Sequence, residues 1–375
     1  MIESGAVPLF IQLLTSVNED VREQAAWAIG NIAGDSVHCR DYVLNLNAFD
    51  ALGQVFTEHA RLSTIRNATW TLSNLCRGKP APNFSLVEPA LPLLARLIFS
   101  QDIETVTDAC WALSYISDGP NERIQAVLDA GVSPRLVELL SQSNQSSVQT
   151  PALRAVGNIV TGDDAQTQHI VNLNVIPALC WLLDSPKKNI RKEACWTLSN
   201  ITAGTPDQIQ FIIEAGVFPK LIDMLRGSEF EIQKEAAWAI SNATSGGNHQ
   251  QLMYIAQLGA IPPLCQLLQA SEVRILTVAL EGLENIINAA KAQPADVFEQ
   301  VVEAFHNCDG VTAIEHLQNH ATRSIYERAT RLIEVDFGGE EEEDAASQIV
   351  PEVNGNQFQF GMHQQQFSAG GFKFN

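Results

Sequence analysis

The sequence predicts an all-α protein built as a solenoid of about eight three-helix repeats. Two markers recur with one period: a Gly-x-x-Pro turn returns every 42 or 43 residues, and a second position returns every 41 to 43 residues, held by tryptophan in five copies and by Arg154 and Glu281 in the other two. Two markers that keep one register through seven copies are typical of helical repeats of about 40–47 residues. A single repeat cannot cover its own apolar face, so the repeats are expected to stack on one another.

The turn marker begins each repeat. In the first copy it runs from Gly5 to Pro8, and in the second copy Asp50 replaces the proline. We expect each proline at the first helical position, where its missing N–H does no harm. The remaining copies of the proline are Pro92, Pro134, Pro177, Pro219 and Pro262.

The first repeat illustrates the three helices expected of every unit. An apolar stretch at 8–14 is followed by a polar break at 16–20. A longer helix is predicted over 21–33, because its apolar residues recur at helical spacing, and Gly34 is expected to cap its carboxyl end. A shorter helix is predicted over 37–46.

The same reading sets the domain organisation. The repeats are predicted at about 1–46, 47–88, 89–130, 131–173, 174–215, 216–258, 259–308 and 309–337, the last one shortened. From 338 to 375 the pattern stops. This tail carries the acidic run Glu340–Asp344 and then Gln, Gly and isolated Phe residues, a composition that predicts disorder.

Composition excludes several classes of function. The net charge of −20 argues against direct binding to nucleic acid, which needs a basic surface. No segment approaches the roughly 20 apolar residues that span a bilayer. The seven cysteines form no CxxC pair and are expected to be reduced, mostly buried thiols of a cytosolic or nuclear protein. We expect no metal or cofactor, and we interpret His316 and His320 as a pair on a helix surface.

A second pattern lies on the predicted long helices, where a tryptophan and an asparagine stand four residues apart. Positions i and i+4 share one helix face. That face is out of phase with the core stripe, because Trp27 falls between Ala26 and Ala28 rather than on the line of Ile29 and Ile32. Repetition would build two parallel ladders along the solenoid. The pairs are Trp27/Asn31, Trp70/Asn74, Trp196/Asn200 and Trp238/Asn242.

The chemistry of these ladders suits an extended, basic peptide. An asparagine side chain offers both a donor and an acceptor to a peptide backbone. A Lys or Arg stem between two indoles would gain apolar contact and a cation–π term of about 0.5–2 kcal/mol. Carboxylates at Asp35, Glu193 and Glu235 would select cations. In the alternative interpretation, the repeated Trp and Asn residues only pack or bridge helices inside the stack.

These segments resemble the armadillo (ARM) repeats of the importin-alpha (karyopherin-alpha) family over essentially the whole chain. The resemblance rests on WAIGNIAGD at 27–35, WTLSNLCR at 70–77, WTLSNITAG at 196–204 and WAISN at 238–242. It implies a right-handed armadillo solenoid and a nuclear import adaptor that binds classical nuclear localisation signals and moves between cytoplasm and nucleus. It implies no enzyme, and we find no phosphate-binding loop or nucleophile elbow.

The resemblance also implies two binding sites. Trp111, Tyr115 and Arg154 interrupt the ladder between them. The residues that match the major site are Gln24, Trp27, Asn31, Asp35, Asn67, Trp70, Asn74 and Arg77. The residues that match the minor site are Arg154, Asn158, Thr167, Glu193, Trp196, Asn200, Glu235, Trp238 and Asn242.

Partners follow from the same resemblance. Family members bind importin-beta through a basic amino-terminal segment, whereas this sequence opens at the register of the third repeat without a Lys/Arg-rich start, so importin-beta binding and a full major site are not expected. The run Glu340–Asp344, with the last repeat, resembles the region that contacts the export receptor. The alternative function is a scaffold of the beta-catenin type, which would line its groove with Lys and Arg.

Overall fold

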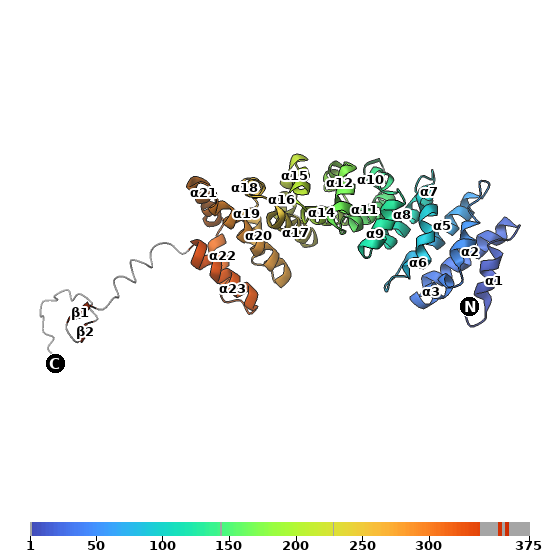
Figure 1. Ribbon diagram of the computed structural model, residues 1–375, viewed down its shortest axis with the longest axis horizontal. Coiled ribbons are helices and arrows are strands. Elements are labelled where there is room, and N and C mark those ends of the chain that lie inside the picture. Colours follow the sequence, from blue (N-terminus) through green and yellow to red (C-terminus); the bar gives the residue numbers. More distant parts are fainter. Residues whose placement is uncertain (1, 143–144, 228, 338–351, 355–356, 360–375) are drawn as a thin grey trace, which may run out of the picture. The chain divides into compact units, whose positions relative to one another are not determined.

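The structure is a computed structural model that describes residues 2–142, 145–227, 229–337, 352–354 and 357–359. It comprises two compact units, Met1–Gly310 and Val311–Asn375. The first unit is entirely helical where it is described, as the sequence predicts. Its elements follow one another in chain order (Figure 1) as α1 (Ala6–Leu13), α2 (Glu19–Asp35), α3 (Val37–Leu44), α4 (Ala48–Gly53), α5 (Leu62–Cys76), α6 (Phe84–Val87), the 3-10 turn η1 (Glu88–Ala90), α7 (Leu91–Leu97), α8 (Ile103–Ser117), α9 (Asn121–Asp129), α10 (Ser133–Gln142), α11 (Ser146–Ile159), α12 (Asp164–Asn172), α13 (Val175–Leu182), α14 (Lys188–Thr202), α15 (Pro206–Glu214), α16 (Phe218–Gly227), α17 (Phe230–Gly246), α18 (His249–Gln257), α19 (Ile261–Leu267), α20 (Val273–Lys291) and α21 (Ala295–His306).

The long helices form the spine of this unit. In the series α2, α5, α8, α11, α14, α17 and α20, each member packs on the next. The helices that precede them also meet across repeats, as α1 with α4 and α10 with α13 do, and so do the helices that follow them, such as α12 with α15. Each repeat therefore buries its apolar residues against its neighbours.

The turn that opens a repeat has a left-handed backbone. Gly5 adopts φ 69°, and Gly131, Gly216 and Gly259 adopt φ values of 70°, 67° and 85°. Asn47 and Asn174 take this conformation at the equivalent position, which asparagine tolerates better than most residues. The prolines lie at the second or third helical position, not the first as predicted. Their missing N–H is harmless there too, because the first four amides of a helix have no partner within it.

The end of α2 corrects one expectation. The helix continues through Gly34 and ends at Asp35, so Gly34 is not a cap. Glycine is suited to this position because a Cβ there would lie 3.2 Å from Nδ2 of Asn74 in the next repeat. The side chain of Ser36 then accepts a hydrogen bond from the amide of Cys39 and caps α3.

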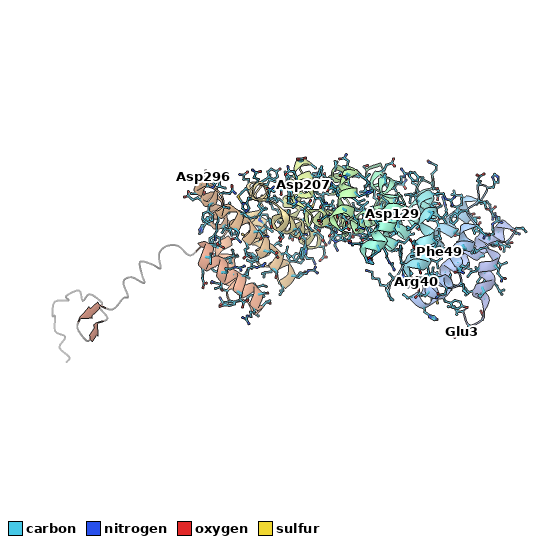
Figure 2. The ribbon with its side chains drawn as sticks, in the orientation of Figure 1. Glu3, Arg40, Phe49, Asp129, Asp207 and Asp296 are labelled. Carbon is cyan, nitrogen blue, oxygen red and sulfur yellow. The ribbon has the colours of Figure 1, made fainter. Side chains whose placement is uncertain are left out.

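Burial fixes the state of several polar groups in this unit. Burial raises the pKa of Cys76, Cys110 and Cys195 to about 12 each, so these thiols stay protonated. Arg40 is only 1% exposed and donates to the carbonyl oxygens of Arg77 at 2.9 Å and Pro80 at 3.0 Å, which ties the segment after α5 to α3 (Figure 2). No described helix is long and apolar enough to cross a bilayer.

The second unit contains the short elements that follow. They are α22, which begins at the last residue of the first unit (Gly310–Leu317), α23 (Arg323–Leu332), the π-helical turn η2 (Ile333–Phe337), β1 (Glu352–Asn354) and β2 (Gln357–Gln359). The strands pair antiparallel, with Val353 opposite Phe358, in a segment that we predicted to lack structure. The acidic run Glu340–Asp344 lies outside the described residues. His320 lies beyond the end of α22, so the predicted helical His pair is wrong.

Candidate functional site

The tryptophans of the sequence pattern lie on five of the long helices, and α11 carries Arg154 at the equivalent position. Each is partly exposed rather than enclosed in the core, and Trp27 is 51% exposed. Because the helices of the series pack in order, their tryptophans form a ladder across the repeats. Its members are Trp27 on α2, Trp70 on α5, Trp111 on α8, Trp196 on α14 and Trp238 on α17.

Glycines of the preceding repeat hold two of these rings. A Cβ on Gly30 would collide with the indole of Trp70, and a Cβ on Gly157 would collide with the indole of Trp196. The hydroxyl of Thr71, beside Trp70, donates to the carbonyl oxygen of Ala26 at 2.8 Å. One face of each indole thus rests on the neighbouring helix, which fixes the orientation of the ring.

The asparagine ladder differs from the prediction in one respect. Nδ2 of Asn74 donates to the carbonyl of Gly30 at 3.1 Å, Asn158 to that of Ser114 at 2.8 Å, and Asn242 to that of Ser199 at 2.9 Å. Three amide donors therefore bridge helices, and their side-chain oxygens remain as acceptors. Asn31 instead donates to Trp27 of its own helix, and the buried Nδ2 of Asn200 has no partner among the described residues.

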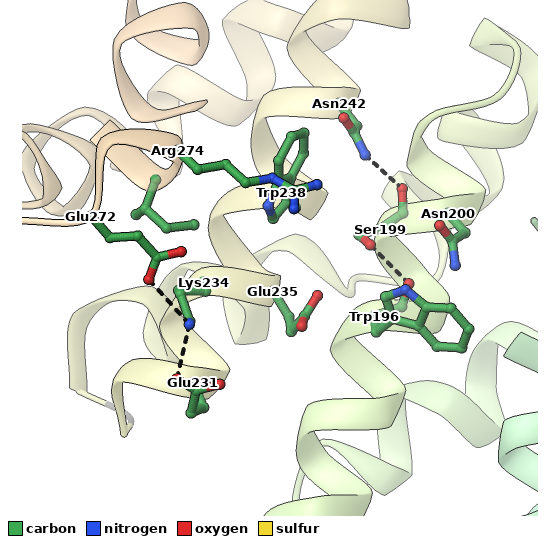
Figure 3. Close-up of a pocket in the computed structure, with 11 residues that line it drawn as sticks. Trp196, Ser199, Asn200, Glu231, Lys234, Glu235, Trp238, Asn242, Glu272 and Arg274 are labelled. Carbon is green, nitrogen blue, oxygen red and sulfur yellow. Dashed lines mark hydrogen bonds and ion pairs between the residues drawn. The ribbon is translucent and has the colours of Figure 1, made fainter. Parts of the chain in front are cut away.

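A pocket opens between the last two tryptophans of the ladder (Figure 3). Lys234 at its wall donates to Glu231 at 2.8 Å and to Glu272 at 3.2 Å. Aromatic rings and amide groups line the pocket, together with three carboxylates and two cationic side chains. Its lining comprises Trp196, Ser199, Asn200, Glu231, Lys234, Glu235, Trp238, Asn242, Glu272, Arg274 and Ile275.

Arginines of this chain already lie on the indole faces. The guanidinium carbon of Arg274 is 5.2 Å from the ring centroid of Trp238, and that of Arg154 is 5.6 Å from the ring centroid of Trp196. Arg154 also forms an ion pair with Glu193. Glu193 was predicted to attract a ligand cation, but one of its oxygens is taken up by Arg154. The rings thus accept guanidinium groups in this geometry.

Glu235 is the carboxylate without such a partner. It is partly buried in the pocket, and no cation among the described residues lies within ion-pair distance of it. Burial raises the pKa of Glu235, with nearby Lys192 opposing that shift and Glu193 adding to it. A carboxylate that has lost water and gained no counter-ion is a favourable position for a cation from outside.

The residues predicted for the major site lie on α2 and α5, except Arg77, which follows α5. Gln24, Asn31 and Asp35 are exposed, and Nδ2 of Asn67 approaches Glu23 at 3.4 Å. Arg77 is exposed just after α5, where its carbonyl oxygen accepts the hydrogen bond from Arg40 described above.

Sequence reasoning missed Asp108. It stands three residues before Trp111, the same offset as Glu193 and Glu235 from their tryptophans, and that offset could have revealed it. Burial, with a smaller contribution from Glu104, raises the pKa of Asp108 to about 6. Trp111 stacks on Tyr115 with ring centroids 5.8 Å apart, so this repeat has a second aromatic ring where the others have asparagine.

Thr167, which was predicted for the minor site, is buried. It lies on α12, is 3% exposed, and its hydroxyl donates to Val160 at 3.4 Å. Its assignment to the minor site came from the resemblance, and the structure places it inside the stack. Among the described residues no group of His, Cys, Asp or Glu could hold a metal ion.

Comparisons with known proteins agree with this architecture. The Armadillo/beta-catenin-like repeat model matches residues 1–34, 36–77, 85–118, 120–161, 163–203, 205–245 and 248–287, and the Atypical Arm repeat model matches residues 299–352. An engineered protein of known structure, 26% identical, aligns with a TM-score of 0.70 over 89% of this chain and 89% of its own. A designed armadillo repeat protein, solved in complex with the peptide (KR)4, is 32% identical, with a TM-score of 0.59 over 65% of this chain and 98% of its own.

The stacked three-helix units and their tryptophan ladder define an armadillo repeat protein. Importin subunit alpha-1b of Oryza sativa subsp. japonica is 53% identical over 378 residues, which cover 100% of this chain and 70% of the rice protein. Importin subunit alpha-3 of Arabidopsis thaliana is 51% identical over 96% of this chain and 68% of its own length. The chain belongs to the importin-alpha family, a family of transport adaptors rather than enzymes.

Proposed function

We propose that this chain binds Lys/Arg-rich nuclear localisation signals along the tryptophan ladder and acts as a nuclear import adaptor that moves between cytoplasm and nucleus. The observation that carries the proposal is the position of Glu235. Its carboxylate lies between Trp196 and Trp238 in the pocket, desolvated and without a counter-ion among the described residues (Figure 3).

A Lys side chain of an extended peptide could contact the indoles of Trp196 and Trp238 and pair with Glu235. Its methylenes would lie against an indole and its ammonium would pair with Glu235. The free side-chain oxygens of Asn158 and Asn242 would accept hydrogen bonds from the peptide backbone. We assign the minor site to Arg154, Asn158, Glu193, Trp196, Asn200, Glu235, Trp238 and Asn242.

The relatives support this choice of ligand. The rice and Arabidopsis proteins carry the name importin, and the designed armadillo protein holds a peptide of alternating Lys and Arg. A major site on α2 and α5 would use Gln24, Trp27, Asn31, Asp35, Asn67, Trp70, Asn74 and Arg77. We extend that site to Asp108 on α8, because a desolvated carboxylate beside the next tryptophan is suited to the same cation.

A scaffold that binds acidic peptides is the second candidate, and the pocket argues against it. Glu231, Glu235 and Glu272 outnumber Lys234 and Arg274 in the lining. An acidic peptide would therefore meet repulsion there. Contact of the export receptor with Glu340–Asp344 remains a proposal from the resemblance alone.

The test is equilibrium binding of two labelled peptides, one with six consecutive Lys or Arg residues and one with Glu in their place. We expect the basic peptide to bind and its affinity to fall as salt rises, because the contact is electrostatic. Glu235→Arg should abolish binding at the minor site, whereas Glu303→Arg, the same charge change at an exposed position of α21, should leave it intact. Equal affinity for both peptides, or no difference between the two variants, would refute the proposal.

A further inference from the structure

Two thiols meet near the carboxyl end of the first unit, outside both proposed peptide sites. Cys265 lies on α19, and Cys308 follows α21, which packs against α19. The thiol of Cys265 donates a hydrogen bond to the sulfur of Cys308. Both residues belong to the repeat predicted over 259–308, so this contact joins the first helix of that repeat to its end.

The turn between α21 and α22 brings the second sulfur to the first. Asp309 has a left-handed backbone with φ 55°, and α22 begins at the next residue. Gly310 leaves room for Cys265, because a Cβ at Gly310 would lie 2.6 Å from the sulfur of Cys265. The carbonyl oxygen of Phe305 accepts a hydrogen bond from the thiol of Cys308 at 3.5 Å. The backbone of this turn therefore holds the two sulfurs beside each other.

The two thiols differ in exposure and in acidity. Cys265 is 3% exposed, whereas Cys308 is partly exposed. The hydrogen bond from Cys265 lowers the pKa of Cys308, and the amide of Gly310 adds to that shift, although burial and the charge of Asp309 oppose it. The same hydrogen bond, together with burial, raises the pKa of Cys265. Because the thiolate is the reactive form of cysteine, Cys308 is the nucleophile and Cys265 is the protonated thiol next to it.

We propose that Cys265 and Cys308 are a redox-sensitive pair that forms a reversible disulfide when the chain meets a peroxide. Disulfides in reducing compartments are usually transient and redox-sensing rather than structural. A partly exposed thiolate with a second cysteine next to it is the arrangement typical of such sensors. The proposal does not depend on what the tryptophan ladder binds.

The reaction takes place in two steps. The sulfur of Cys308 attacks one oxygen of hydrogen peroxide, so an S–O bond forms, the O–O bond breaks, and the departing hydroxide takes up a proton and leaves as water. The sulfur of Cys265 then attacks the sulfenic acid on Cys308, so the S–S bond forms and the S–O bond breaks. The hydroxide that departs leaves with the thiol proton of Cys265 as a second water. The two thiols lose two electrons, and the peroxide gains them.

The disulfide would stabilise the repeat that contains it. It would link α19 covalently to the turn before α22, and a cross-link of this kind restricts the unfolded chain more than the folded one. Repeats near the end of an array have fewer neighbours to support them, so they open more readily than central ones. Oxidation should therefore make this end of the first unit harder to unfold.

The first test treats the reduced full chain with increasing amounts of hydrogen peroxide, blocks the remaining thiols with iodoacetamide, and maps the peptides by mass spectrometry without reduction. We expect a cross-linked pair of peptides that contains Cys265 and Cys308, lighter by two hydrogen atoms than the two free peptides and separated again by dithiothreitol. Cys308→Ser should abolish this product. Cys180→Ser is the matched control, because it removes another partly exposed thiol, on α13, and should leave the product unchanged.

A second arm tests the order of the two steps and their effect on stability. In Cys265→Ala the sulfenic acid on Cys308 has no second thiol to react with, so dimedone should trap it there, whereas the parent should give little trapped product. The midpoint of thermal unfolding should rise by about 3–8 °C when the parent is oxidised, and Cys308→Ser should show no such rise.

Several results would overturn the proposal. Peroxide that oxidises Cys308 to sulfenic or sulfonic acid in the parent while Cys265 stays a free thiol would show that the two sulfurs do not pair. A cross-link that joins other cysteines, or an unchanged yield of the same product in Cys308→Ser, would also refute the pair. If the disulfide forms but the unfolding midpoint does not rise, the stabilising role of the bond is refuted.

Discussion

The indole of Trp196 lies so close to Gly157 of the preceding repeat that a single added methyl group would overlap its ring. The same relationship joins Trp70 to Gly30 in the proposed major site. The absence of a side chain in one repeat therefore sets the orientation of an aromatic ring in the next, and this pairing can be tested without touching any proposed ligand contact.

Gly157→Ala should displace the ring of Trp196. We expect a loss of about 1–3 kcal/mol in stability, as for other overpacked interiors, and weaker binding of a basic peptide at the minor site. Thermal unfolding and peptide titration measure the two effects. Gly53→Ala is the matched control, because nothing lies within 4 Å of its added Cβ and helical alanine is preferred over glycine. Equal behaviour of the two variants would contradict the packing described above.

Asp108 makes stability depend on pH. Its pKa in the folded chain is about 6 against an ordinary 3.8, so between these values the folded state binds the proton more tightly than the unfolded chain. The free energy of unfolding therefore falls as pH rises through this window. Asp108→Asn should be more stable than the parent at pH 7, by about 1 kcal/mol after allowance for solvent screening of a half-buried group, and the difference should vanish below pH 4. Melting curves at several pH values measure it.

The same group should make peptide binding depend on pH. A bound Lys favours the carboxylate, so the peptide must displace a proton when the pH lies below about 6. Affinity at the major site should fall as pH decreases from 7 to 5, and Asp108→Asn should be weaker at pH 7 with a flatter profile. The measurement uses a peptide with one basic cluster and a protein that carries Glu235→Arg. Because this substitution should abolish binding at the minor site, the pH dependence that remains belongs to the major site. An unchanged profile in Asp108→Asn would show that the carboxylate does not face the ligand.

Replacing a buried asparagine that bonds to the next repeat should cost more stability than replacing an exposed one. Asn158 is 6% exposed and donates to the carbonyl of Ser114, so Asn158→Ala removes this buried inter-repeat bond, leaves that carbonyl only the longer bond from the hydroxyl of Ser117 at 3.2 Å, and should lower stability by about 1–2 kcal/mol. Asn31 bonds only within its own exposed helix face, and Asn31→Ala should change stability by less than about 0.5 kcal/mol. Thermal unfolding distinguishes them. If both variants were equally stable, the inter-repeat bond would contribute nothing.

The spacing of the two proposed sites sets a minimum linker for a two-part signal. Packed helices lie about 8–10 Å apart, so three repeats from Trp70 to Trp196 span about 30 Å. An extended chain covers about 3.3 Å per residue, which requires roughly nine residues between the basic clusters. A peptide with an eleven-residue linker should bind more tightly than either cluster alone, and one with five should not. Comparable affinity for both linkers would place the sites closer together than proposed.

Much of this architecture could be predicted from the sequence, because the period and the helical phase are properties of residue order alone. The repeat length places five of the six tryptophans on the long helix of their unit, Trp181 on α13 being the exception, and the offset of Trp27 from Ile29 and Ile32 keeps the ring out of the core. The start of α12 depends on equally local contacts, because Asp163 caps the helix through a reciprocal pair of hydrogen bonds with Gln166.

What could not be predicted depends on contacts between repeats. Nothing in the pattern shows that Arg154 and Arg274 reach across to neighbouring indoles, since long flexible side chains have no fixed direction in sequence. Glycine is common at the carboxyl-terminal cap of a helix, but Gly34 lies inside α2, where the missing side chain leaves room for Asn74. Thr167 was carried over by resemblance, and only its surroundings reveal that its hydroxyl is buried.

The spine of long helices has one more consequence. Each helix from α2 to α20 packs on its immediate neighbours in that series, so a distortion introduced at α5 has no direct path to α17. Natural variation, or a protein engineer, could exchange the unit that carries Trp70 for one with different side chains while the Glu235 pocket keeps its shape. The proposed peptide recognition would then be modular, because each repeat could be changed separately.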